Sequence, residues 1–343
     1  MLLRPLRQEE RAAYDATVQH PLQSWAWGDF RSQTGVQVER VGFFEEGKLK
    51  AALQVFFHKI PGTSMTAGYL PKGQMPDEEQ LNAITQLGKK HHSLFVKMEP
   101  NVGRSVETKS GFEEIAKFLQ TNNARPGRPL FTKYTFQLDL TPSEEKLFGQ
   151  LSSKTRYNVN VAFKKGVQIY ENTTKEGMDQ YVEILNETTQ RQGFYAHTPA
   201  YFKTMWEVLG RTGMLRVFTA VYEEKVLVSW IMFVFNGVLY YPYGASRSIH
   251  RDVMASNLMM WEMIRFGKQQ GCKSFDMWGS LGPEPNEKDP WFGFHRFKKG
   301  FGGELVEFLG TYDLVTNPPL YPIYRIVEDL RWKALRLKAR LRK

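Results

Sequence analysis

Hydrophobic and polar positions follow the same order in two parts of the chain. In each part, two segments that alternate like strands flank a polar turn, and a third strand, a helix and a short apolar strand follow. In the first part these elements are 38–44, 49–57, 64–70, 77–91 and 94–98. In the second part they are 215–222, 226–235, 238–244, 252–270 and 273–278. A strand and helices precede each set, over 2–33 and 167–211, so the order β, α, α, β, β, β, α, β is predicted twice.

One such unit resembles the acetyltransferase fold of the GNAT type, whose central sheet splays open to admit an acyl donor. The sequence therefore predicts an α/β protein made of two tandem GNAT-like acyltransferase domains. We expect the first at 1–145 together with 316–343, and the second at 146–315. In GNAT proteins a glycine-rich loop before the central helix binds the donor's pyrophosphate. The corresponding loops, 68–73 and 244–252, lack that glycine spacing, so we expect no coenzyme A cofactor.

The composition is that of an ordinary globular protein. The chain has 343 residues, 42% hydrophobic and 24% charged, which is enough for two sizeable cores. Its one cysteine, Cys272, excludes an intrachain disulfide, and the seven histidines show no ligand spacing, so we expect no metal. The beginning does not resemble a signal peptide, and the most apolar stretch, 226–241, is too short to span a bilayer. These features predict a cytoplasmic protein.

The positive charge is concentrated near the end of the sequence. The net charge is +10, and residues 331–343 contain seven lysines and arginines and no acid. Leu330, Ala334, Leu337 and Leu341 repeat at helical spacing, which predicts a helix with one apolar seam and basic flanks. Such a helix can contact an anionic membrane surface, here the inner face, or the phosphates of tRNA. Alternatively, it packs its seam against the protein.

Several motifs resemble the Fem peptidyltransferases. Residues 151–166 (LSSKTRYNVNVAFKKG) resemble the family's Lys-x-Arg-Tyr-Asn…Ala-x-Lys-x-Gly motif, and 294–304 with 307–313 resemble its C-terminal signature. Further segments match the family in the same order, at 23–30, 240–246, 261–267 and 271–279. The chain has no long charged heptad segment, so it resembles the short form of the family, similar to FemX.

The resemblance implies a reaction. Fem enzymes transfer an amino acid from aminoacyl-tRNA to the stem-peptide amine of a peptidoglycan precursor, and so start or extend an interpeptide bridge. The acceptor is UDP-MurNAc-pentapeptide in FemX-like members and lipid II in others. For this chain we expect an aminoacyltransferase that uses a small amino acid: glycine, alanine or serine. The alternatives are an aminoacyl-tRNA–protein N-terminal transferase or an acyl-CoA enzyme on the same fold, and a non-catalytic RNA- or membrane-binding protein.

The resemblance assigns catalysis to Lys298 and Phe297, which we expect in a glycine-relieved loop over 297–303. A fixed ammonium at Lys298 would stabilise the oxyanion and the departing ribose oxygen. Phe297 would stack on the terminal adenosine of the tRNA. The alternative is that Lys298 and its neighbour Lys299 only bind the RNA backbone.

Other positions are expected to hold the acceptor. By resemblance, Arg31 and Arg191 bind its phosphates, and Tyr195 shares a helix face with Arg191 if the helix extends that far. Tyr241 and Tyr243 alternate along the third strand, so we expect both to face the same side and to line the acceptor groove. The alternatives are a solvated helix arginine at 31, a structural Arg191 and core tyrosines.

A second basic cluster, Lys154, Arg156, Lys164 and Lys165, falls on a predicted helix. We expect Lys154 and Arg156, with Lys299, to contact tRNA. For Arg156, a phosphate contact and a structural salt bridge remain equal alternatives. No carboxylate pair indicates a general base, although Glu99 and Asp276 end comparable strands in the two units.

Overall fold

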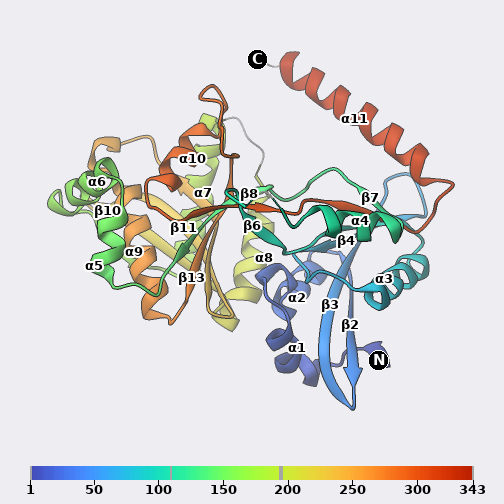
Figure 1. Ribbon diagram of the computed structural model, residues 1–343. Helices are drawn as coiled ribbons and strands as arrows, with labels where there is room; N and C mark the ends of the chain where they lie inside the picture. The colour runs from blue at the N-terminus through green and yellow to red at the C-terminus, as the bar shows by residue number, and fades with distance from the viewer. Residues whose placement is uncertain (1, 109, 193–195, 342–343) are drawn as a thin grey trace.

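The computed structural model describes residues 2–108, 110–192 and 196–341, the last seven of them by backbone alone. Two β-sheets stand next to each other, and helices cover their faces (Figure 1). In the view of Figure 1 the second sheet lies on the left and the first on the right.

The first sheet has the strand order β1-β2-β3-β4-β5-β15-β7. Its strands are β1 (Leu2–Pro5), β2 (Gln37–Glu45), β3 (Lys48–Lys59), β4 (Thr66–Pro71), β5 (Ser93–Glu99), β15 (Tyr312–Val315) and β7 (Ala124–Pro126). The helices of this part are α1 (Arg11–Thr17), α2 (Trp25–Gln33), α3 (Glu78–Lys90), α4 (Glu113–Thr121) and α11 (Tyr321–Leu341). Strands β4 and β5 run parallel and are connected by α3, as a crossover requires.

The second sheet has the order β6-β14-β8-β13-β12-β11-β10-β9. Its strands are β6 (Gly103–Ser105), β14 (Glu304–Phe308), β8 (Tyr134–Asp139), β13 (Ser274–Ser280), β12 (Val238–Ser246), β11 (Lys225–Phe235), β10 (Leu215–Tyr222) and β9 (Gln168–Glu171). Its helices are α5 (Glu144–Gln150), α6 (Ser153–Lys164), α7 (Lys175–Gln192), α8 (Pro199–Leu209), α9 (Ala255–Gln269) and α10 (Phe292–Lys299). Short 3₁₀ turns are η1 (Gln8–Glu10), η2 (Pro21–Gln23), η3 (Gly210–Thr212) and η4 (Arg251–Val253).

The predicted duplication is confirmed in the order of elements. Both hairpins turn through residues with positive φ, Glu46 and Gly47 in the first and Glu223 and Glu224 in the second. The turn between β11 and β12 uses Asn236 (φ 45°) followed by a glycine (φ 73°), the pair that favours a tight hairpin. Each parallel crossover, β4-α3-β5 and β12-α9-β13, repeats the predicted pattern.

The two sheets exchange strands across the expected domain division. Strands β6 and β8 precede residue 146 but pair within the second sheet. Strand β15 precedes residue 316 but pairs with β5 and β7 of the first sheet. The division at 145 and 316 stays a prediction, and the observed sheets are linked by these crossing strands.

A shared hydrophobic core joins the two parts. Trp27 and Phe30 of α2 belong to the same buried cluster as Tyr181 of α7, Phe202 of α8 and Phe233 of β11. Phe30 packs edge-on against the ring of a tyrosine on α8, with ring centroids 4.9 Å apart. Burying aromatic rings on both sides of the junction fixes the two sheets relative to each other.

The parallel strands at the centre of the second sheet diverge. Strand β12 pairs with β13 only from Val238 to Tyr240, opposite Ser274 to Asp276. In the first sheet the matching pair, β4 and β5, stays together to Pro71 and Glu99. The open wedge that a GNAT-like unit needs is therefore formed in the second sheet.

Candidate active site

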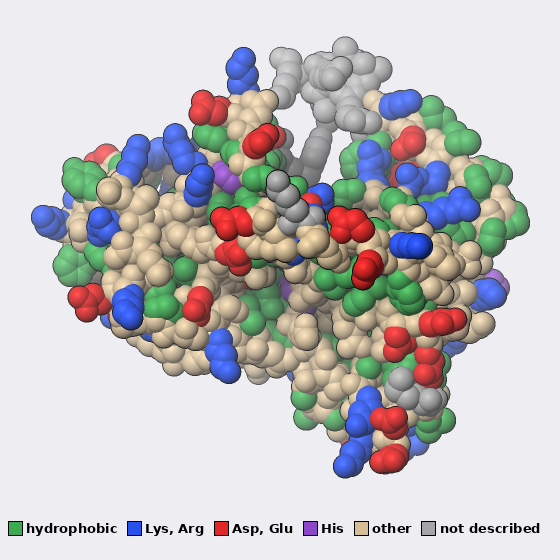
Figure 2. All heavy atoms as spheres, in the orientation of Figure 1, with side chains coloured by type: hydrophobic (Ala, Val, Ile, Leu, Met, Phe, Trp, Pro, Cys, Tyr) green, Lys and Arg blue, Asp and Glu red, His purple; other side chains and the backbone are tan. Residues whose placement is uncertain are grey.

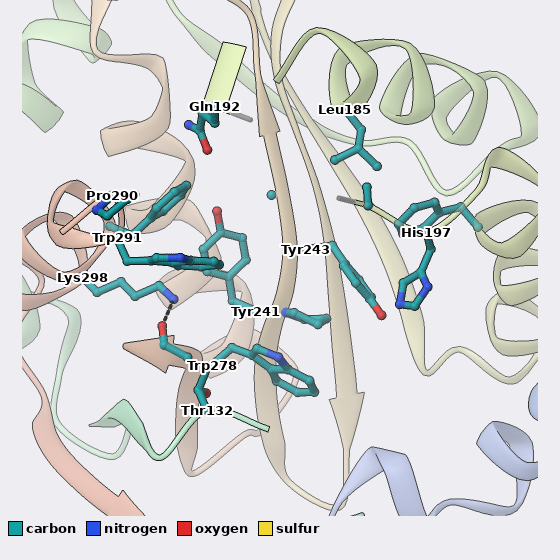
Figure 3. A pocket seen from close by; sticks show the side chains of 16 residues that line it. Thr132, Leu185, Gln192, His197, Tyr241, Tyr243, Trp278, Pro290, Trp291 and Lys298 are labelled. Atoms are coloured by element: carbon teal, nitrogen blue, oxygen red, sulfur yellow. Dashed lines mark hydrogen bonds between the residues drawn. The ribbon is translucent and has the colours of Figure 1, made fainter. Parts of the chain in front are cut away.

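A pocket of about 980 Å³ lies where β12 and β13 diverge. Figure 3 shows the side chains that line it: Tyr241 and Tyr243 come from one strand, with Tyr241 on the side of Lys298 and Tyr243 on the far side. Its lining also includes Gln192 of α7 and Trp291, which precedes α10. The volume is sufficient for an organic substrate of drug-like size or larger.

A bulge in β12 brings the two predicted tyrosines into this pocket. Ile231 pairs with Tyr243 and Phe233 with Tyr240, so Tyr241 and the following proline stand opposite a single residue of β11. Tyr241 stacks on Trp230, with ring centroids 4.1 Å apart, whereas Tyr243 packs against a phenylalanine of α8. The expectation that both rings face the same side of the sheet is therefore wrong, because the bulge breaks the alternation. Both nevertheless line the pocket.

Gly244 makes room for the Tyr241 ring. A Cβ at Gly244 would lie 2.0 Å from the hydroxyl oxygen of Tyr241. Only glycine therefore allows this ring to lie flat along the strand at the bulge. Burial raises the pKa of Tyr241 and of Tyr243 well above the usual value, so both phenols stay protonated and can donate hydrogen bonds.

Lys298 lies in the last turn of α10 and not in a loop, which corrects the expectation for 297–303. Gly300 ends the helix, and only Gly302 and Gly303 of that segment have positive φ. The Lys298 side chain is 6% exposed, and its Nζ donates to the carbonyl oxygen of Gly279 at 2.6 Å (Figure 3). Burial lowers the pKa of Lys298 to about 8, so at neutral pH it is still mostly an ammonium ion.

The backbone at the end of β13 fixes the carbonyl group to which Lys298 donates. Trp278 has a φ of 64°, a backbone conformation that large side chains rarely adopt. Asp276 stabilises it, because its Oδ1 accepts from the Trp278 N–H at 2.7 Å and from the Thr135 hydroxyl at 2.6 Å. The turn directs the Gly279 carbonyl toward Lys298 and places the indole in the pocket wall. Sequence reasoning did not identify Trp278 as a pocket residue. The available signal was Asp276, two residues earlier, whose side chain accepts from the Trp278 N–H.

Phe297 lines a smaller pocket of about 270 Å³. Tyr241 lines both this pocket and the main one. The Phe297 ring is half-buried and packs edge-on against Trp230 and Phe301. One part of the ring therefore stabilises the core, and the other part is available for stacking in that pocket.

Arg31, on α2 of the first unit, lies at the junction between the two sheets. Its guanidinium carbon lies 5.9 Å from the Tyr201 ring centroid, and its buried Nε has no hydrogen-bond partner among the described residues. Burial and the charge of Arg31 lower the pKa of His197, which lines the main pocket. His197 is therefore a neutral imidazole in the same pocket lining as Tyr241 and Tyr243, and sequence reasoning did not identify it.

The guanidinium of Arg191 donates hydrogen bonds to other residues of this protein. Its Nη2 donates to the carbonyl oxygen of Ser246 and its Nη1 to the hydroxyl of Ser248, both at 2.9 Å. This clamp connects α7 to the segment after β12, next to Gln192 in the pocket wall. Its predicted phosphate contact stays a prediction. Tyr195 lies outside the described residues.

The three residues expected to contact tRNA are not part of the lining of the main pocket. Lys154 and Lys299 are exposed, and Arg156 is partly buried. The Arg156 Nη1 donates to the carbonyl oxygen of Gly149 at 3.0 Å, so it closes the end of α5. Figure 2 shows several Lys and Arg side chains over the region of α5 and α6. Their contact with tRNA stays a prediction.

A second buried lysine occupies the seam between the sheets. Lys72 is 2% exposed, and its Nζ lies 2.9 Å from the ring centroid of Phe308 and 4.1 Å from that of Phe131. Burial lowers the pKa of Lys72 to about 7, against the attraction of Asp276 and Glu99. The sequence analysis placed this lysine in the loop 68–73 and found no signal for its burial.

Comparison with known proteins identifies the family. A family model described as the FemAB family matches residues 6–220 and 210–329. This chain belongs to the FemAB family. It is 23% identical to the lipid II:glycine glycyltransferase of Staphylococcus haemolyticus, over 94% of this chain and 95% of that protein. It is 22% identical to the enzyme of the same name from Staphylococcus aureus strain USA300, with the same coverage. Both relatives are transferases, the class predicted for this chain.

Solved structures confirm the fold of this FemAB chain. It superimposes on a crystal structure of FemX with a TM-score of 0.83 and 19% identity, covering 94% of this chain and 99% of that one. A tandem GNAT protein from the clavulanic acid biosynthesis pathway gives a TM-score of 0.54 at 11% identity, covering 92% and 98%. The predicted pair of GNAT-like units and the likeness to FemX are therefore confirmed. The alignments to the staphylococcal relatives have 407 and 409 positions, so those proteins contain segments absent from this FemAB chain.

Within 2–108, 110–192 and 196–341, no three His, Cys, Asp or Glu side chains cluster in a way that could bind a metal. No helix in the same ranges has the length and hydropathy needed to cross a bilayer.

Proposed function

We propose that this protein transfers a small amino acid, glycine, alanine or serine, from aminoacyl-tRNA to the stem-peptide amine of a peptidoglycan precursor. The observation that supports it most directly is the buried ammonium of Lys298 in the wall of a pocket between diverging strands. Relatives that match along nearly the whole chain are named for glycyl transfer involving lipid II. The proposed acceptor is lipid II or its soluble precursor, UDP-MurNAc-pentapeptide.

The chemistry requires one bond to form and one to break. The acceptor amine attacks the carbonyl carbon of the aminoacyl ester, and an amide forms as the ester C–O bond breaks. The proton lost by the amine reaches the departing ribose oxygen, so the tRNA leaves with a free hydroxyl. Between these events a negative charge develops on the carbonyl oxygen, and a preorganised cation lowers the barrier.

Lys298 has the geometry for that task. One of its three N–H groups is bound to the carbonyl of Gly279, which fixes the ammonium position and leaves two donors for the pocket. Its burial removes competing water, so each remaining donor acts more strongly on a developing oxyanion. Tyr241, whose ring centroid lies 5.6 Å from the Lys298 Nζ, and Tyr243 provide protonated phenols in the same pocket, where they can bind acceptor oxygens.

The test is product analysis with the purified protein. A pool of tRNAs charged with glycine, alanine and serine is incubated with UDP-MurNAc-pentapeptide or with lipid II, and the products are weighed by mass spectrometry. We expect one precursor to gain the mass of a single amino-acid residue. Parallel arms contain a peptide with a free N-terminus as acceptor, or acetyl-CoA as donor. Product only in one of these arms, or in none, would contradict the proposal.

A further inference from the structure

Helix α11 is attached to the first sheet by one face. Tyr321 is 4% exposed, and its hydroxyl donates to Asp313 Oδ2 at 2.9 Å. One turn further, the ring of Tyr324 packs on Phe95, with ring centroids 5.0 Å apart. These contacts fix the beginning of the helix and the direction in which it leaves the body (Figure 1).

The same face touches the body again near residue 332. The guanidinium carbon of Arg128 lies 4.5 Å from the ring centroid of Trp332. At about 3.6 residues per turn, positions 321, 324, 328 and 332 fall on one side of a helix. This is the side that holds α11 to the protein.

The opposite side of α11 is apolar and exposed. Ile323, Ile326, Val327 and Leu330, here called the apolar stripe, are 58%, 62%, 57% and 60% exposed. Their spacing places them about half a turn away from the attached face. The sequence continues the same spacing with Ala334, Leu337 and Leu341. The described part of the predicted seam, Leu330 and Ala334, is therefore exposed and does not pack against the body.

Basic residues border the apolar stripe. Arg331 and Lys333 are exposed on α11 and fall on either side of it by helical spacing. Five more lysines and arginines follow through residue 343, without an acid after Asp329. An exposed apolar band with cationic borders is the pattern of helices that lie in the interface of a membrane.

We propose that α11 docks this protein on a bilayer surface that contains anionic lipids, with the apolar stripe inserted among the headgroups. The basic borders attract the anionic headgroups. The stripe then removes four large side chains from water. This inference does not depend on the transfer reaction, because it concerns only where the protein lies.

The apolar stripe favours a membrane over the other partners. Contact with nucleic-acid phosphates needs the cations but leaves the four aliphatic side chains in water. A second copy of the chain would cover the stripe but would bring the cationic borders of two helices together. A bilayer with anionic lipids satisfies both features. In Figure 1, α11 projects on the same upper side of the molecule as α10, which carries Lys298.

The test is sedimentation of the full chain with vesicles. Phosphatidylcholine vesicles containing about 30% phosphatidylglycerol should bind the protein, and binding should fall with added salt. The double variant Ile326→Glu with Leu330→Glu should lose at least about tenfold in vesicle affinity. The matched control Tyr157→Glu with Phe163→Glu, which changes two exposed rings of α6, should bind as the unmodified protein does.

Charge is tested in the same assay. Arg331→Gln with Lys333→Gln should weaken binding to anionic vesicles several-fold, and Lys225→Gln with Lys273→Gln should not. Unchanged unfolding temperatures show that the variants fold. Absence of vesicle binding by the unmodified protein would overturn the proposal. So would equal binding by the stripe variant and its control, or self-association in vesicle-free solution that the stripe variant abolishes.

Discussion

The Nζ of Lys298 donates a hydrogen bond to the carbonyl oxygen of Gly279 over 2.6 Å. This bond joins the last turn of α10 to the bulged end of β13, next to the pocket. It gives a flexible side chain one defined position, because the acceptor belongs to backbone that Asp276 already fixes. Substitutions of Lys298 or Asp276 are therefore expected to reduce the transfer rate more than they reduce the stability of the fold.

Lys298→Met should lower kcat for amino-acid transfer by about 10²–10³-fold, because the cation that we propose stabilises the oxyanion is lost. Methionine has a similar length and tolerates burial, so the unfolding temperature should change little. Single-turnover rates with charged tRNA measure the effect. The neighbouring exposed lysine is the matched control: Lys299→Met should retain most of the rate. Equal losses in both variants would indicate that the two lysines only bind RNA.

The pH dependence of transfer should report the pKa of Lys298, which burial lowers to about 8. The proposed role of Lys298 requires the protonated form, so kcat/KM should fall as the pH rises through about 8. The negative charge of Asp276 raises this pKa, and Asp276→Asn should therefore move the falling limb to lower pH. Asp139→Asn, at the exposed end of β8, should leave the limb in place. An unchanged limb in Asp276→Asn would contradict this assignment.

Gly244→Ala should displace the Tyr241 ring, because the added Cβ would lie 2.0 Å from its hydroxyl oxygen. We expect KM for the peptidoglycan precursor to rise about tenfold, the effect of losing one good hydrogen bond to a charged group. Steady-state kinetics at varied precursor concentration measure it. The control is Gly149→Ala, where no atom lies within 4 Å of the new Cβ.

Arg31→Ala should raise KM for the precursor by about 10–100-fold with a smaller effect on kcat, because the charge-assisted contact to phosphate predicted for this residue is removed. Arg31→Lys should recover part of the loss, since it keeps the charge but not the planar donor geometry. Arg211→Ala changes an exposed arginine of η3 and should have no effect. A pure loss of kcat in Arg31→Ala would place this residue outside acceptor binding.

Stability should depend on pH through Lys72, whose pKa is about 7 in the folded state and near its ordinary value when unfolded. Between these values the unfolded chain binds the extra proton, so stability rises with pH. The difference in unfolding free energy between the unmodified protein and Lys72→Met should shift by about 1.4 kcal/mol per pH unit above pH 7, in favour of the unmodified protein. Denaturant titrations at several pH values test this. A constant difference would mean that Lys72 keeps its ordinary pKa.

Local sequence predicted the repeated elements because each depends on nearby residues. Asn236 followed by glycine predicted a hairpin, and both adopt positive φ. The alternation around 215–235 predicted strands because one register buries the apolar positions. Of the second basic cluster, Lys154, Arg156 and Lys164 lie on the predicted helix, α6, and Lys165 caps its end.

The details of the pocket depend on distant residues. The bulge at Tyr241 exists where β12 leaves β13, a relationship that no local pattern encodes. Trp278 keeps its left-handed backbone because Asp276 and Thr135, far apart in sequence, meet beside it. The glycines after Lys298 suggested a loop, but Gly300 sits at a helix end, which glycine also favours.

The insertion of β15 between β5 and β7 has a consequence for how the protein is made. During synthesis, residues 1–145 leave the ribosome long before residues 312–315. Until β15 is made, the edge of β5 therefore has no strand to pair with. An unpaired strand edge readily captures other chains. Vectorial synthesis therefore leaves the amino-terminal half dependent on a segment produced near the end, and severing that segment should disable the half that was made first.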